Sequence, residues 1–362
     1  MKVLFRCDAS TIIGIGHFMR CLTIADQLRA KGHITAFSSR HLPEGLIAIL
    51  RNKGHLLFLL TSAQVHEKFN NGRGQYDDWL GVPWIVDAEE NKEVMKSFKP
   101  NWLVVDHYSL DCHWEDYLCP FVDKILVIDD LADRNHRCNV LVDQNLYLNM
   151  EERYKFLVPS NCITLLGPRY AILRSEFSQK RIQVKKNINR LQRILVFFGG
   201  SDHRNITRTA IHGLQDVIPE NGIVDVVVGT SNPHKYMIKQ LCSQLNSFRY
   251  YEQIDFISDL MVKADFSFGA GGSSTWERCC LGLPSALVSI ADNQVPLIEG
   301  VSQQGAILNL GSAESLKSEC FAEIFIKMAK DINSLNLMKK IGLSLVDGLG
   351  TERVVNTLES YV

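Results

Sequence analysis

The chain has 362 residues, of which 46% are hydrophobic and 22% are charged, and its 39 basic and 40 acidic residues give a formal net charge of -1. This composition excludes disorder over most of the chain. The balanced charge argues against a nucleic-acid-binding protein, which usually has a basic excess. No apolar run approaches the ~20 residues of a membrane span, and the charged start is unlike a signal peptide. We therefore expect a cytoplasmic protein that binds neither membrane nor nucleic acid.

Short apolar runs alternate with amphipathic stretches in the first half of the chain. A strand is predicted at residues 2–7, and a helix at 16–31 that ends at Gly32. Continuous apolar runs are typical of strands covered on both faces. Further strands are predicted at 34–38, 55–60, 102–106, 124–129 and 140–143. This alternation indicates a parallel sheet, whereas residues 61–95 show no clear pattern and are expected to be irregular.

The second half repeats this pattern after a polar stretch at 179–192. Strands are predicted at 194–198, 223–228, 266–268 and 284–289, and a closing helix at 351–360 with Thr351 as its N-cap. The predicted fold class is α/β, with two Rossmann-like domains whose parallel sheets face each other across a cleft. Residues 1–178 form the first domain, 179–192 a linker and 193–362 the second domain, whose last helix could pack back toward the first.

One candidate motif joins the first strand to the first helix. Residues 6–20 read Arg-Cys-Asp-Ala-Ser-Thr-Ile-Ile-Gly-Ile-Gly-His-Phe-Met-Arg. Glycines allow a ligand to approach closely, and a helix N-terminus favours anions, although the third glycine of a dinucleotide fingerprint is absent. His17 lies in the first helical turn, where the helix dipole favours the neutral imidazole that suits a general base. The alternative is a helix-capping or core histidine.

Polar residues also follow two buried strands, at Asp106-His107-Tyr108 and at Asp129-Asp130. Ligands of open parallel sheets bind beyond the carboxyl ends of the strands, so both positions are candidates. The paired carboxylates could do acid/base work or bind a metal, and a loop with a helix-capping aspartate is the alternative. Cys112 and His113 nearby match no standard ligand spacing, so no metal is expected.

A second glycine-rich motif, Gly-Ala-Gly-Gly-Ser-Ser-Thr-Trp-Glu, occupies residues 269–277. Backbone N–H groups and hydroxyls at a helix start can hold phosphates. Glu277 can accept hydrogen bonds from a ribose diol, and the segment around Ile257 could present a backbone edge to a base. The alternative is a capped helix with Glu in its first turn. Asn293 and Gln294 form a further strand-end loop, for which a polar turn with a helix N-cap would be the preferred interpretation if it stood alone.

With these motifs in order, residues 1 to about 310 resemble the nucleotide-sugar hydrolases of pseudaminic acid biosynthesis, which act on UDP-2,4-diacetamido-2,4,6-trideoxy-β-L-altropyranose. The family's opening pattern is matched by Arg6, Asp8, Gly14, Gly16, His17 and Arg20. Its Asp-His-Tyr, linker, Gly-Gly-Ser/Thr-Asp and Asn-Gln motifs are matched by residues 106–108, 167–177, 199–202 and 293–294. Added length around residues 60–95 and at the C-terminus departs from the family and bears on substrate selection.

The resemblance implies a glycosyltransferase B-type fold with sugar chemistry at the cleft between the domains. Water would attack the anomeric carbon with inversion, with His17 as the general base and Asp8, Tyr108 and Asn293 holding the sugar or the water. The remaining substrate-site residues would be Arg6, Gly14, Gly16, Arg20, Asp106, His107 and Gln294. The UDP site would comprise Gly200, Ile257, Gly271, Gly272, Ser273, Ser274 and Glu277. No cofactor is expected, the partner is the UDP-linked sugar, and the protein is expected to be a monomer.

Two other classes of function remain open. A glycosyltransferase of the same fold would transfer a UDP-amino sugar to a hydroxyl acceptor and hydrolyse it slowly. A nucleotide-sugar sensor would bind the UDP-sugar and never release UDP, and it would have no need of a histidine at the reacting end.

Overall fold

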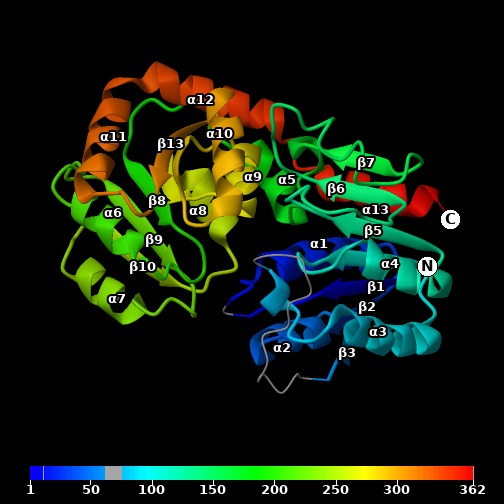
Figure 1. Cartoon of the computed structure of the whole chain (residues 1–362). Coiled ribbons are helices and arrows are strands. Elements are labelled where there is room, and N and C mark those ends of the chain that lie inside the picture. The colour runs from blue at the N-terminus through cyan, green and yellow to red at the C-terminus, as the bar shows by residue number, and fades with distance from the viewer. Residues whose placement is uncertain (11, 62–75, 362) are drawn as a thin grey trace. The chain divides into compact units, whose positions relative to one another are not determined.

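Two parallel sheets organise the chain in the computed structural model, which describes residues 1–10, 12–61 and 76–361 (Figure 1). Each sheet belongs to a separate unit. The first unit contains residues 1–145, 149–172 and 350–362, and the second contains 146–148 and 173–349. The expected α/β class with two Rossmann-like domains is confirmed.

The first unit has a seven-stranded sheet in the order β3-β2-β1-β4-β5-β6-β7, with every neighbouring pair parallel. Its strands are β1 (Lys2–Cys7), β2 (Ile34–Ser39), β3 (Leu56–Leu59), β4 (Trp102–Asp106), β5 (Lys124–Ile128), β6 (Val140–Asp143) and β7 (Ile163–Leu166). The sequence pattern missed β7 because this edge strand is largely exposed and has no buried apolar run.

Helices cover both faces of this sheet. They are α1 (Gly16–Ala30), α2 (Glu44–Asn52), α3 (Trp84–Phe98), α4 (Cys112–Leu118) and α13 (Gly350–Ser360), with short 3₁₀ turns η1 (Asp77–Trp79), η2 (Cys119–Phe121) and η3 (Pro168–Tyr170). Alternate residues of a strand point to opposite faces. Val3 and Phe5 therefore pack with α1 and α13, whereas Leu4 packs with α3 and α4.

The helix α3 corrects the expectation that residues 61–95 are irregular, although residues 62–75 lie outside the described residues. Pro83 precedes the helix, and Ala88, Met95 and Phe98 face the core at helical spacing. Six charged residues are interspersed within the helix, at positions 87, 89, 90, 92, 93 and 96, and its C-cap Lys99 is also charged. They obscured the apolar periodicity.

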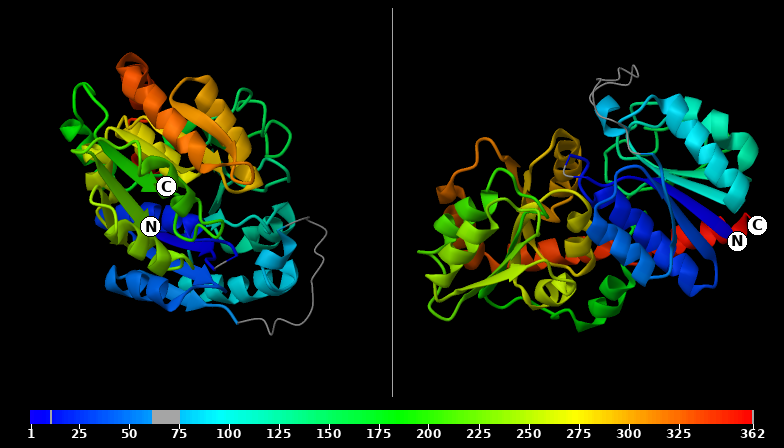
Figure 2. Two further views of the ribbon diagram at one scale, coloured as in Figure 1. Left: turned by 90° about the vertical axis from the view of Figure 1, so that its left-hand side faces the viewer. Right: turned by 90° about the horizontal axis from the view of Figure 1, so that it is seen from below.

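The last helix, α13, belongs to the first unit. Val354, Val355 and Leu358 lie in the same core cluster as Val3 and Phe18. Figure 2 shows this helix, in red, beside the blue N-terminal part of the chain. Thr351 lies inside the helix, which begins at Gly350, rather than capping it as expected.

The second unit has a six-stranded parallel sheet in the order β10-β9-β8-β11-β12-β13. Its strands are β8 (Arg193–Phe197), β9 (Ile223–Val228), β10 (Phe248–Glu252), β11 (Phe266–Ala270), β12 (Ser285–Ser289) and β13 (Ile307–Ser312). Its helices are α5 (Ser175–Lys180), α6 (Ile206–Leu214), α7 (Lys235–Ser243), α8 (Ile257–Lys263), α9 (Ser273–Cys280), α10 (Val295–Gln303), α11 (Ser318–Lys330) and α12 (Ile332–Leu345), with 3₁₀ turns η4 (Arg181–Gln183) and η5 (Asp292–Gln294).

The polar stretch 179–192 is fixed to this second unit rather than running free as a linker. Arg181 donates hydrogen bonds to the carbonyls of Cys280 and Val346, and Lys185 pairs with Asp265 at 2.7 Å. Ile188 is buried in the core of the second unit. The charged side chains therefore hold this segment against the protein surface.

Candidate active site

The carboxyl ends of β1 and β4 are level with each other in the first unit. Cys7, the last residue of β1, pairs with Asp106, the last residue of β4. The loop after β1 leads into α1, whose second residue is His17. The parallel register therefore brings the start of α1 next to the polar residues that follow β4.

His17 and Asp106 form a buried pair. The Nδ1 atom of His17 lies 2.5 Å from Oδ1 of Asp106, whose side chain is completely buried. A hydrogen bond from Nδ1–H to a carboxylate leaves Nε2 as the nitrogen that can exchange a proton with a ligand. This geometry is the one a histidine base requires, and the expected contact of Asp106 with a ligand stays a prediction.

Arg20 connects this pair to a second carboxylate. It donates to Asp106 through Nε at 2.9 Å and Nη2 at 2.8 Å, and to both oxygens of Asp130 through Nη1 at 2.8 Å. Both ends of its guanidinium are therefore engaged with carboxylates. Arg20 holds Asp106 and Asp130 together, and its expected contact with substrate stays a prediction.

Tyr108 completes the network by donating from its hydroxyl to Asp130 at 2.7 Å. Burial would raise the pKa of Asp130, but the charge of Arg20 and the hydrogen bonds from Arg20 and Tyr108 hold it well below its usual range. Burial, with the charge of Asp130, raises the pKa of Tyr108 well above its ordinary value. Asp130 is thus a carboxylate and Tyr108 a neutral phenol at physiological pH.

Three expected site residues have side chains that lie inside the fold. Arg6 and Asp8 have no exposed side-chain surface, and His107 is almost completely buried. Arg6 pairs with Asp87 and, at 2.9 Å, with Asp8. Asp8 also accepts hydrogen bonds from the backbone of Arg40 at 2.7 Å and of His41 at 3.1 Å.

Arg6, Asp8 and His107 form a buried ion cluster. Burial would raise the pKa of Asp8, but the charge of Arg6 and the hydrogen bond from His107 hold it far below its usual range. Burial lowers the pKa of His107, whose Nε2 lies 3.3 Å from Asp8. These side chains thus stabilise one another inside the fold, and the expected contact of Asp8 with sugar or water stays a prediction.

The two loop glycines differ in conformation. Gly14 adopts a φ of +78°, which L side chains rarely adopt, and its N–H donates to the carbonyl of Ser10 at 2.8 Å. Gly16 is the first residue of α1, and neither glycine has atoms close to where a Cβ would lie. Thr11 of the same motif lies outside the described residues.

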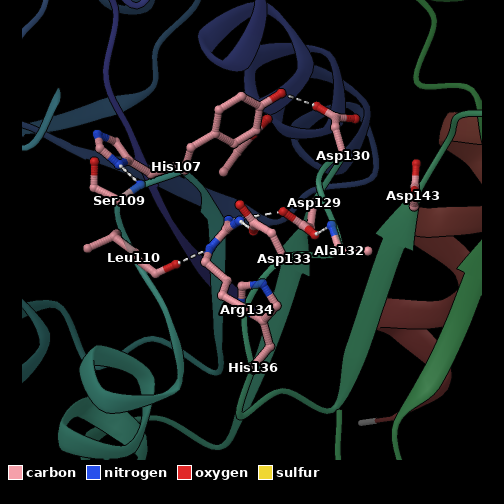
Figure 3. Close-up of polar contacts among 12 residues, drawn as sticks. His107, Ser109, Leu110, Asp129, Asp130, Ala132, Asp133, Arg134, His136 and Asp143 are labelled. Carbon is pink, nitrogen blue, oxygen red and sulfur yellow. Dashed lines mark hydrogen bonds and ion pairs between the residues drawn. The ribbon is translucent and has the colours of Figure 1, made fainter. Parts of the chain in front are cut away.

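Asp129 has a structural role in the loop after β5. Figure 3 shows it accepting from the backbone N–H of Ala132 at 2.8 Å, and Arg134 lies 3.0 Å from its Oδ1. On the neighbouring strand, burial and the charge of Asp130 raise the pKa of Asp143 to about 7. Asp129 and Asp130 therefore have different roles. Asp129 stabilises the loop after β5, and Asp130 is joined to Arg20.

In the second unit, the glycine-rich turn between β11 and α9 carries the expected nucleotide residues. Gly272 has a φ of +104° and caps α9, whose first two residues are Ser273 and Ser274. A Cβ on Gly271 would lie 2.8 Å from Ile298. Gln294 lies against the same turn, since its Nε2 would be 3.8 Å from a Cβ on Gly272. The structure thus brings the glycine turn together with the late Asn-Gln loop.

Glu277 lies one turn into α9 and keeps its carboxylate available. Its side chain is 19% exposed, and its closest charged partner among the described residues is Arg174 at 3.9 Å. Burial raises the pKa of Glu277, and the positive charge of Arg174 opposes this shift. A carboxylate in this state can accept hydrogen bonds from a diol.

Arg278 is buried directly beneath the glycine turn. It donates to the hydroxyls of Ser274 and Ser267 and to the carbonyl of Phe197, all of which are neutral. Burial lowers the pKa of Arg278 to about 10. A cation held this way favours an anion at the adjacent helix start. The sequence reasoning missed it because nothing in the motif distinguishes it from a surface arginine.

The other expected nucleotide residues lie in the same unit. Ile257 is the first residue of α8 and its side chain is buried, which leaves its backbone as the group that a base could contact. The carbonyl of Gly200 accepts from Ser231 at 3.1 Å. Asn293 is half-buried in η5.

Among the described residues, Asp111, Cys112 and His113 are the group whose side chains lie close enough to share a metal ion. Asp111 already caps α4 by accepting from the backbone N–H of His113 at 2.8 Å. His113 is largely exposed. None of the helices that the structure describes has the length and apolar character needed to span a bilayer.

No family model matches the chain. In sequence, the chain is 26% identical over 306 residues to UDP-2,4-diacetamido-2,4,6-trideoxy-beta-L-altropyranose hydrolase of Campylobacter jejuni, covering 84% of this chain and 97% of that protein. It is 28% identical over 370 residues to the spore coat polysaccharide biosynthesis protein SpsG of Bacillus subtilis, covering 99% and 98%.

In structure, the chain is similar to the calicheamicin glycosyltransferase CalG4, with a TM-score of 0.67, 14% identity, and coverage of 99% and 98% of the two chains. This similarity confirms the glycosyltransferase B-type fold. The resemblance that the motifs indicated is confirmed by the sequence similarity over most of the chain.

Proposed function

We propose that this chain, a relative of the Campylobacter hydrolase with a glycosyltransferase B-type fold, is a nucleotide-sugar-processing enzyme that hydrolyses UDP-2,4-diacetamido-2,4,6-trideoxy-β-L-altropyranose. Its products are UDP and 2,4-diacetamido-2,4,6-trideoxy-L-altropyranose, a step of pseudaminic acid biosynthesis. It acts in the cytoplasm as a monomer and without a metal ion.

The single observation that carries this proposal is the His17–Asp106 pair at 2.5 Å. In the proposed reaction, Nε2 of His17 takes a proton from water as the water oxygen bonds to the anomeric carbon. The bond from that carbon to the UDP oxygen breaks, and the electron pair leaves with UDP. Attack opposite the leaving group inverts the anomeric configuration.

The nucleotide is assigned to the second unit. The N–H groups and hydroxyls at Gly271–Ser274, with the buried cation of Arg278, support stabilisation of the charge that develops on the diphosphate. Glu277 accepts hydrogen bonds from the ribose, and Asn293 and Gln294 lie on the loop beside this turn. We also assign Tyr108 to the sugar site, because the centroid of its ring lies 4.5 Å from that of His17.

A glycosyltransferase is the second candidate, and it is favoured by the fold shared with CalG4. The two reactions differ in the acceptor. A transferase needs a hydroxyl acceptor for rapid turnover, whereas a hydrolase releases UDP with water alone.

The test is incubation of the purified chain with this UDP-sugar, EDTA and ¹⁸O-labelled water, followed by mass spectrometry. We expect label in the free sugar and unlabelled UDP. Label in UDP would mean attack at phosphorus and would remove the role proposed for His17. No release of UDP without an acceptor would favour the transferase.

The matching variant is His17→Ala, with His113→Ala as its control on an exposed histidine. We expect His17→Ala to lose about 10²–10⁴-fold in kcat and to keep its affinity for the UDP-sugar. Unchanged turnover would show that the base lies elsewhere.

A further inference from the structure

Trp79 places an aromatic ring beside the proposed base. It is the last residue of η1, in the region where the sequence predicts added length relative to the hydrolases that the chain resembles. Its ring is stacked on that of Tyr108, with centroids 5.3 Å apart and planes inclined by 20°. It approaches His17 edge-on at 5.9 Å. His17, Trp79 and Tyr108 form what we call the aromatic corner.

The position of Trp79 is fixed by its neighbours. Ser109 donates from its hydroxyl to the carbonyl of Tyr76 at 2.5 Å, which ties this segment to the loop after β4. The ring of Tyr76 lies 4.9 Å from that of Trp79. Leu80, the next residue, is completely buried in the core on the α3 face of the sheet. Trp79 is therefore held between anchored positions.

Trp79 nevertheless remains only half-buried. A residue that served packing alone would gain by burying all of its large apolar surface. The exposed part of the indole is a surface for a ligand, and it lies beside the imidazole that would face the anomeric carbon.

An aromatic surface distinguishes sugars by their hydroxyl groups. C–H groups and methyls pack well on an aromatic ring, whereas a hydroxyl pressed against it loses its hydrogen bonds to water. In the 2,4-diacetamido-2,4,6-trideoxy sugar, C6 is a methyl group and each acetamido group ends in another methyl. The ring carries a single hydroxyl besides the anomeric one. UDP-N-acetylglucosamine, in contrast, carries hydroxyls at C3, C4 and C6.

We propose that Trp79 is a specificity-determining residue that selects deoxygenated, acetamido-bearing sugars by packing on their apolar edge in the aromatic corner. This inference rests on the proposed function, since it takes the sugar to react beside His17. It assigns Trp79 a contact with the substrate rather than with the proton that His17 transfers.

The kinetic test compares Trp79→Ala and Trp79→Phe with a matched control, Trp84→Ala, whose ring lies near His113. We expect Trp79→Ala to raise KM for the UDP-linked diacetamido-trideoxy sugar about 10–200-fold, the range for losing apolar contact in a pocket. The inhibition constant of UDP-N-acetylglucosamine should change less than about twofold. Trp79→Phe should lie between wild type and Trp79→Ala, and Trp84→Ala should match wild type.

Two kinetic results would overturn the inference. Equal weakening of both UDP-sugars would show that Trp79 does not discriminate between them. A fall in kcat with KM unchanged would show that Trp79 only supports Tyr108 and His17. If Trp79→Ala does not fold, Trp79→Phe still decides the question because it keeps a stacking ring.

A binding test separates this inference from the proposed function. Tryptophan fluorescence of wild type and Trp79→Phe is titrated with free 2,4-diacetamido-2,4,6-trideoxy-L-altrose, and we expect a change in wild type that Trp79→Phe loses. That result without any UDP release would overturn the function and keep the inference. UDP release together with identical titrations of wild type and Trp79→Phe would keep the proposed function and overturn the inference. If neither UDP release nor a fluorescence change is seen, the proposed function and the inference are both overturned.

Discussion

The Nδ1 atom of His17 and the Oδ1 atom of Asp106 lie 2.5 Å apart although 89 positions separate the two residues in the chain. The contact arises because β1 and β4 are neighbours in the sheet and end at the same level. The pairing orients the imidazole of His17 at the start of α1, which supports its proposed role as the base.

Replacing Asp106 by Asn tests this orientation. The amide no longer holds the proton on Nδ1, so Nε2 loses its role as the basic nitrogen. We expect kcat for UDP release to fall about 10²–10⁴-fold, with KM changed less than about threefold. The control is Asp133→Asn, which removes a half-exposed carboxylate paired with Arg134. Equal activity of the two variants would contradict a positioning role for Asp106.

Glu277 and Glu176 provide a matched pair, since both lie near Arg174. If Glu277 binds the ribose, Glu277→Ala removes hydrogen bonds to a charged acceptor worth about 1.5–3 kcal/mol. We expect UDP affinity measured by calorimetry to fall about 10–150-fold in Glu277→Ala and to be unaffected in Glu176→Ala. An unchanged UDP affinity in Glu277→Ala would refute the ribose assignment.

Asp143 predicts a pH-dependent contribution to stability. Burial and the charge of Asp130 raise its pKa to about 7 in the folded chain, against about 3.9 when unfolded. The folded state thus binds the proton of Asp143 more tightly than the unfolded state does. The resulting contribution to the free energy of unfolding is present below about pH 4 and is lost as pH rises through 7. We expect wild type to lose up to ~1.4 kcal/mol per pH unit in this window relative to Asp143→Asn.

The measurement for Asp143 is the melting temperature of wild type and Asp143→Asn between pH 4.5 and 8. The melting temperature of Asp143→Asn should increase relative to that of wild type as pH rises. A constant difference across this range would show that Asp143 is ionised throughout.

The loop after β1 predicts opposite effects for its two glycines. Gly14 has a φ of +78°, so Gly14→Ala should cost about 1–2 kcal/mol in backbone strain. Gly16 begins a helix with open space around its Cβ position, so Gly16→Ala should be neutral or stabilising by up to ~1 kcal/mol. Thermal unfolding of the two variants compares them directly. A loss of stability in Gly16→Ala equal to that in Gly14→Ala would contradict the described loop.

The strands were predictable where apolar residues form a continuous run. The predicted ranges 2–7, 102–106, 140–143 and 223–228 match β1, β4, β6 and β9 end to end. Such strands are buried on both faces, and their composition reports this directly. The exposed edge strand β7 and the helix α3 carry mixed polar and apolar residues, so their patterns depend on neighbours that the local sequence does not reveal.

The site was predictable in its loops but not in its roles. The parallel topology brings four polar residues near the carboxyl ends of β1 and β4, as expected: Arg6, Asp8, His17 and Asp106. Whether a polar side chain points to a ligand or into the fold depends on partners far away in the chain. Asp87, which lies on α3, forms an ion pair that holds Arg6 in the interior, and Arg20 links Asp106 to Asp130. Trp79 escaped notice because its neighbours in space are distant in sequence.

The helix α13 has a consequence for how the chain is made. Val354, Val355 and Leu358 complete the core that Val3, Phe5 and Phe18 begin. During synthesis, the first strands leave the ribosome long before these three residues are joined to the chain. The second unit has all of its strands by residue 312 and can therefore close first. The first unit waits with the part of its core beneath α13 uncovered, so we expect nascent chains halted before residue 350 to be bound by chaperones.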